Sequence, residues 1–156
     1  MKRILEPVLL LALFFLSVSC VKNETEEVVY LDVTANNLSG DWRLESMNGT
    51  PANGNAPVYV RFIRKDSRYE LYSNVGSMEY TRKSGSFVIL QDEFSGYILR
   101  GDYDFTLGEQ WNHDYAVLLT EDHMTWTAVD DKDDVCVYVR CTIPEEIISL
   151  FPSLGD

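Results

Sequence analysis

The sequence is poor in cysteine, histidine and basic residues, and each shortage narrows what the chain can do. Among 156 residues there are three cysteines and two histidines, and neither histidine stands at zinc-ligand spacing from a cysteine. Thirteen Lys and Arg face 25 Asp and Glu, which gives a formal net charge of −12. Because this excess repels phosphate backbones, nucleic acid is not an expected partner; solubility is the simpler explanation of the charge.

Motifs for catalysis are also missing. The sequence has no Gly-x-Ser-x-Gly elbow, no His-Glu-x-x-His and no phosphate loop. The run Asp130–Asp134 carries four carboxylates, but it lacks the alternation and the glycine of a calcium loop, so it predicts a solvated hairpin turn. We therefore expect no enzyme, no cofactor and no metal site.

No hydrophobic run is long enough to cross a membrane. The stretch Val8–Leu16 would cover only about half of a hydrocarbon core as a helix. It follows Lys2 and Arg3 and precedes small residues and Cys20, which is the order of a secretory signal. The cleavage region resembles the lipobox of bacterial lipoproteins, although Ser17 stands where that family favours Leu. The alternative is an ordinary signal peptide with an incidental cysteine.

This resemblance implies a signal peptide over residues 1–19 and an acylated Cys20. Several acyl chains would give a stable membrane anchor. Residues 20–37 are polar and acidic, as in a flexible tether. The acidic cluster between Lys22 and Glu27 resembles the export signal of some Gram-negative surface lipoproteins, or is simply a solvated linker. The expected location is the cell envelope, as an outer-membrane lipoprotein; exposure at the cell surface is left open.

Residues 38–142 predict an all-β domain. Period-two segments alternate with turn signals, and at most nine strands are expected, over 40–47, 58–65, 68–73, 78–82, 86–90, 97–102, 115–120, 124–130 and 135–142. Eight or so antiparallel strands with one apolar face bury it best by closing into an up-and-down barrel, which also removes exposed edges. An open sandwich is the alternative.

Strand parity assigns the faces. Trp42 and Leu44 share the inward side of the first strand. On the last strand Cys136 and Cys141 have opposite parity and lie roughly 16 Å apart if extended, too far for a disulfide. Cys136 is interpreted as a small buried residue, and the role of Cys141 stays open. In residues 143–156, the stretch 143–151 predicts a short helix that packs against the barrel or covers one end.

The start of the domain resembles a lipocalin-like domain. The stretch Leu38–Leu44 holds Gly40-x-Trp42 at its first strand, and further pieces follow in order up to residue 146, at 58–62, 68–72, 101–103, 111, 115–117, 122–125 and 138–140. The whole is similar to lipocalin-like lipoproteins of Gram-negative bacteria. This resemblance implies that Trp42 packs across the closed end of the barrel with Arg140 stacked on it. The alternative interpretation is that Arg140 is a surface charge near the end of a strand.

Two functional hypotheses follow. In the first, the anchored barrel binds a small apolar or amphipathic molecule, as the resemblance implies. In the second, the barrel is filled and the protein is a surface adaptor that contacts a protein or glycan. A cavity of several hundred Å³ would favour the first, and a core packed shut would favour the second.

The candidate site residues fall into two groups. The interior candidates are Leu44, Phe62, Trp126 and Tyr138. The segment Gly101–Tyr115 mixes aromatic, acidic and amide side chains, which could stack on a sugar or another flat polar ligand, or could tuck under the rim as a long hairpin. Its rim candidates are Tyr103, Phe105, Trp111 and Tyr115.

Overall fold

The fold is a closed antiparallel β-barrel of eight strands with one extra short strand. The computed structural model describes residues 27–105 and 109–152, so the expected signal peptide and Cys20 lie outside the described residues. The strands are β1 (Gly40–Met47), β2 (Thr50–Pro51), β3 (Val58–Ile63), β4 (Arg68–Ser73), β5 (Thr81–Asp92), β6 (Gly96–Tyr103), β7 (Tyr115–Leu119), β8 (His123–Ala128) and β9 (Val135–Cys141).

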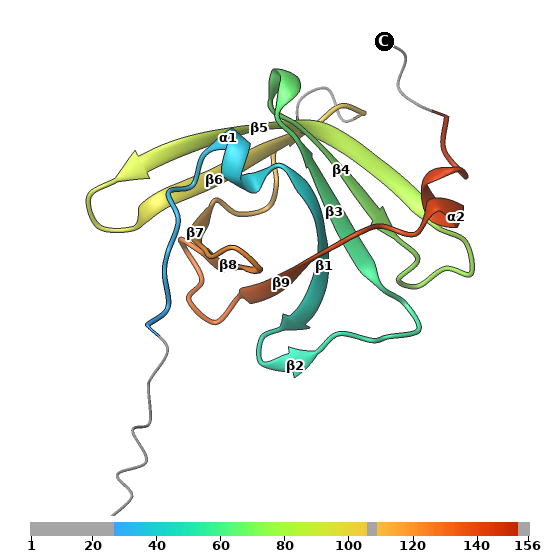
Figure 1. Ribbon diagram of the computed structural model, residues 1–156, viewed down its shortest axis with the longest axis horizontal. Helices are drawn as coiled ribbons and strands as arrows, with labels where there is room; N and C mark the ends of the chain where they lie inside the picture. The colour runs from blue at the N-terminus through green and yellow to red at the C-terminus, as the bar shows by residue number, and fades with distance from the viewer. Residues whose placement is uncertain (1–26, 106–108, 153–156) are drawn as a thin grey trace, which may run out of the picture.

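Each barrel strand pairs with the next along the chain, and β9 returns to β1, where Trp42 lies opposite Arg140. Figure 1 shows the two ends of the barrel sequence, β1 and β9, side by side. The up-and-down barrel that the period-two pattern predicts is therefore confirmed. The short β2 forms a hairpin with the end of β1, in a stretch for which only a turn was expected.

In the middle of the chain, the structure has one long strand where the sequence predicted two short ones. The prediction placed separate strands at 78–82 and 86–90, with a turn between them, but β5 runs unbroken from Thr81 to Asp92. A Cβ at Gly85 would overlap the Asp102 carbonyl oxygen and the Tyr69 ring. Glycine here permits close packing of a neighbouring ring, and does not mark a turn.

The folded part begins earlier than the tether boundary at residue 37 suggests. Leu31 forms a β-bridge with Leu119, and Val33 is buried. The short helix α1 (Ala35–Leu38) follows, capped by the Thr34 hydroxyl, which accepts from the backbone N–H of Asn37 at 3.1 Å. Residues 31–37 thus belong to the barrel, because their apolar side chains complete its core.

The main core fills the barrel. Inward residues from β1, β3, β4, β5, β6, β7, β8 and β9 pack together with Val33 and Leu38. Its largest fully buried members include Trp42, Phe62 and Tyr69. Phe62 and Phe87 meet edge to face with ring centroids 5.1 Å apart. The interior positions expected for Phe62, Trp126 and Tyr138 are correct, and Leu44 is partly buried against the same core.

A second, smaller core lies on the outer face of β3 and β4. The C-terminal helix α2 (Glu145–Ile148) packs there, so that Ile143 and Ile147 are buried against Tyr59 and Tyr72. Figure 1 shows α2 beside the barrel wall. The helix was expected either to pack against the barrel or to cover one end of it, and in the structure it packs against the barrel. This contact explains why β3 has apolar residues on both faces.

Among the described residues, no helix has both the length and the apolar character that a membrane crossing needs.

Candidate functional site

One end of the barrel is closed by Trp42 and Arg140. The Arg140 guanidinium lies 4.0 Å from the centroid of the Trp42 ring, as the resemblance implied. Its Nη1 and Nη2 donate to the carbonyls of Ser39 and Asn37, both at 3.0 Å, and Nε donates to the Glu121 carbonyl at 2.8 Å. The Trp42 indole N–H donates to the Leu38 carbonyl at 2.8 Å. Because every polar group named here is satisfied within the chain, this end is structural.

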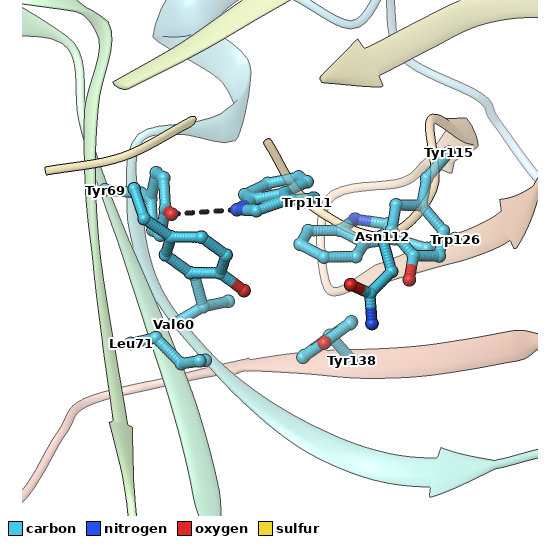
Figure 2. Close-up of a pocket in the computed structure, with 9 residues that line it drawn as sticks. Val60, Tyr69, Leu71, Trp111, Asn112, Tyr115, Trp126 and Tyr138 are labelled. Atoms are coloured by element: carbon cyan, nitrogen blue, oxygen red, sulfur yellow. Dashed lines mark hydrogen bonds between the residues drawn. The ribbon is translucent and has the colours of Figure 1, made fainter. Parts of the chain in front are cut away.

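A cavity of about 170 Å³ lies toward the other end of the barrel. Figure 2 shows its lining, in which Tyr69, Val60 and Leu71 lie on one side and Trp111, Asn112 and Trp126 on the other, with Tyr138 below. The residues that line it are Val60, Tyr69, Leu71, Tyr103, Trp111, Asn112, Tyr115, Trp126 and Tyr138. The cavity is thus a slot between a wall from β3 and β4 and an aromatic wall from the loop before β7, from β8 and from β9.

Trp111 is held in this wall by its neighbours. Its indole N–H donates to the hydroxyl of Tyr69 at 2.8 Å, and its backbone N–H donates to the Gly101 carbonyl at 2.8 Å. A Cβ at Gly101 would overlap the Trp111 ring, so glycine makes the space that the indole occupies. Trp111 is therefore a fixed part of the slot, tucked inside the rim.

The aromatic wall is a continuous stack. The Trp111 and Trp126 rings are nearly parallel, 26° apart with centroids at 5.3 Å. The ring centroid of Tyr115 lies 5.3 Å from that of Trp126, and the ring centroid of Tyr138 lies 4.8 Å from that of Trp126. Offset and tilted rings at these distances attract one another beyond their simple burial. Such packing keeps the wall rigid, so the slot is formed before any ligand arrives.

The slot is polar at a few points but carries no charge in its lining. Burial raises the pKa of Tyr69, Tyr115 and Tyr138 above the ordinary value, so these hydroxyls stay protonated. The indole N–H of Trp126 is buried and has no hydrogen-bond partner among the described residues. An unpaired buried donor is costly, and because this nitrogen is covered from solvent, a ligand in the slot does not reach it.

A second, more polar hollow lies outside the rim, on the other side of Trp111 and Asn112. Arg100 and Asp114 form a bidentate ion pair there, with nitrogen–oxygen distances of 2.8 and 2.5 Å. His113 Nδ1 lies 2.8 Å from an Asp130 carboxylate oxygen. The Arg100–Asp114 pair fastens the loop before β7 to β6, and the His113–Asp130 contact fastens it to the β8–β9 turn.

The rim candidates separate in the structure. Tyr103, Trp111 and Tyr115 line the slot together, whereas Phe105 is 60% exposed and lies outside it, against Tyr103. Phe105 does not line the slot itself, and its place at the rim beside Tyr103 stays a prediction. Residues Thr106–Gly108 of the expected loop lie outside the described residues.

Several lining residues were missed from the sequence. Tyr69 and Leu71 alternate along β4 and both face inward, a signal that strand parity could have provided. Asn112 has no signal except its place beside Trp111. Of the cysteines, Cys136 packs partly buried against the main core, less covered than expected, and Cys141 packs against the second core on the outer face. Both cysteines are free thiols.

No protein-family model and no curated protein matches this sequence.

Proposed function

We propose that this protein is a membrane-anchored, lipocalin-like lipoprotein whose barrel binds one small amphipathic molecule in the slot. The observation that carries the proposal is the preformed cavity lined by aromatic side chains, with tyrosine hydroxyls and an amide among them. Ligand pockets in proteins usually combine such apolar walls with a few placed polar groups.

The size of the cavity refines the first hypothesis. Its volume of about 170 Å³ is below the several hundred Å³ of a large carrier pocket. The end near Trp42 and Phe62 is packed shut, while Trp126 and Tyr138 border open space. The barrel interior is therefore partly filled, and it suits a compact ligand better than a long acyl chain.

The anchor is proposed from the sequence. The signal-like segment 1–19 and Cys20 support acylation and a location in the cell envelope at the outer membrane. Replacing Cys20 by Ser should move the protein from the membrane fraction to the soluble fraction. Retention in the membrane fraction would contradict the anchor.

Ligand binding is tested by extracting the native protein and identifying co-purifying small molecules by mass spectrometry. We expect at least one compact amphipathic compound in stoichiometric amount. The matched control is Leu71→Trp, which fills the slot from the β4 side and should lose the compound. A compound retained by the variant, or none in the native protein, would contradict the proposal.

A surface adaptor is the second candidate, and one observation favours it. Phe94, at the tip of the β5–β6 hairpin, is 96% exposed. On the outer face of the barrel, Val88 is 50% exposed and Leu118 is 58% exposed. An exposed aromatic ring at a hairpin tip is a side chain that a protein partner can bury. If the adaptor role holds, Phe94→Ser should abolish crosslinks to a partner in intact cells, with the Leu71→Trp variant crosslinking normally.

A further inference from the structure

We propose that the slot selects an uncharged, planar, single-ring compound that carries a hydroxyl or carbonyl group, and that it rejects carboxylates such as fatty acids. This inference rests on the proposed function and names its ligand class. Three properties of the slot carry it: its shape, its charge and its hydrogen-bonding groups.

The shape favours one flat ring. The slot's volume of about 170 Å³ is close to that of the roughly 150 Å³ engineered cavity that takes up benzene in another protein. One side presents the aliphatic side chains of Val60 and Leu71, and the other presents the stacked indoles of Trp111 and Trp126 (Figure 2). A planar ring is thinner than a puckered ring of equal mass, and it can stack on an indole face, so it suits this slot better.

The charge excludes anions. No lining residue is ionised, so a carboxylate in the slot would lose its hydration without gaining a cation. Neighbouring carboxylates act in the same direction: burial and, after it, Glu109 raise the pKa of Tyr103, and burial and, after it, Asp134 raise the pKa of Tyr115. One cation is close: the Lys83 ammonium lies 5.7 Å from the Tyr103 ring centroid, but Lys83 is exposed and is not part of the lining.

The polar groups call for an acceptor on the ligand. Tyr138, which is 6% exposed, borders the slot with a hydroxyl that stays protonated, and the Asn112 amide lines the same space. A hydroxyl or carbonyl oxygen on the ring can accept from these donors. A pure hydrocarbon would leave them unpaired.

The test is titration calorimetry of the full chain at pH 7 with four probes: benzyl alcohol, benzoate, cyclohexylmethanol and decanoate. Benzoate differs from benzyl alcohol mainly in charge, and cyclohexylmethanol differs mainly in planarity. We expect benzyl alcohol to bind at least tenfold more tightly than each of the other three. Tyr138→Phe should weaken benzyl alcohol several-fold while leaving the ring stack in place.

Two further variants locate the binding. Leu71→Trp should abolish it, and Leu118→Trp, a matched change on the exposed outer face, should leave it unchanged. If benzoate, decanoate or cyclohexylmethanol binds as tightly as benzyl alcohol, or more tightly, and Leu71→Trp removes that binding, the proposed ligand class is wrong while the binding function stands. If no probe binds the unmodified chain, or binding survives Leu71→Trp, both the ligand class and the binding function fail.

Discussion

Arg140 connects four segments at the closed end of the barrel. It stacks on Trp42 and donates to carbonyls before β1 and in the β7–β8 turn. Gly40, with φ of +121°, leaves room for it, since a Cβ there would lie 2.9 Å from the Arg140 Nη1. One side chain therefore joins the N-terminal segment to the last strand.

Replacing Arg140 by Met should lower the free energy of unfolding by about 2–4 kcal/mol, because three carbonyls lose charged donors and the indole loses its cation. Urea denaturation followed by tryptophan fluorescence measures the change. Arg43→Met, an exposed arginine on the outer side of β1, is the control and should cost less than about 0.5 kcal/mol. Equal effects of the two changes would show that Arg140 acts only as a surface charge.

The Cys136 thiol should react slowly for its degree of exposure. Burial raises its pKa to about 11, from an ordinary value near 9. At pH 8 the thiolate fraction, and with it the alkylation rate by iodoacetamide, should be about a hundredfold below that of the urea-unfolded chain. The rate is measured in a Cys20→Ser, Cys141→Ser background and should climb between pH 9 and 11. In the same window the thiol's contribution to stability is lost, because the unfolded state ionises first. A rate already maximal at pH 8.5 would contradict the assignment.

At the scale of elements, most strands follow from period-two alternation, because each has one face on the core. The exceptions have physical causes that lie far away in sequence. Gly85 looks like a turn residue until the ring of Tyr69 is placed against it. The register of β5 with β6 depends on partners that no local pattern specifies.

The candidate site was predictable to a similar extent. Trp111, Tyr115 and Tyr103 stood out as aromatic residues in one polar segment, and Trp126 and Tyr138 followed from strand parity. The slot itself could not be predicted, because its width depends on how β4 faces β8 and β9 across the barrel. Strand parity in the sequence predicts whether a side chain faces the barrel interior. It does not predict which side chains lie across the interior from it.

The helix α2 should contribute measurable stability through its contact with β3 and β4. Ile147 is 5% exposed, so Ile147→Ala should lower the free energy of unfolding by about 2 kcal/mol. Leu150→Ala, three residues later and 61% exposed, is the matched control and should have little effect. Equal effects in urea denaturation would mean that the helix is not docked on this face in solution.

At the scale of the whole molecule, acidic charge is in large excess. The net charge of −12 produces self-repulsion that salt screens. Within residues 27–105 and 109–152, four Arg–carboxylate pairs oppose this, among them Arg61–Asp41 and Arg100–Asp114, but such partly exposed pairs contribute little each. We therefore expect the free energy of unfolding to rise between 10 and about 200 mM NaCl. A fall would show that the ion pairs outweigh the repulsion.

The N-terminal segment joins the barrel away from the slot. Leu31 pairs with Leu119 at one end of β7, and Tyr115 borders the slot at the other end of that strand. In the anchored state proposed above, the tether would therefore leave the barrel at the end far from the slot, and it would not obstruct a ligand's path into the barrel.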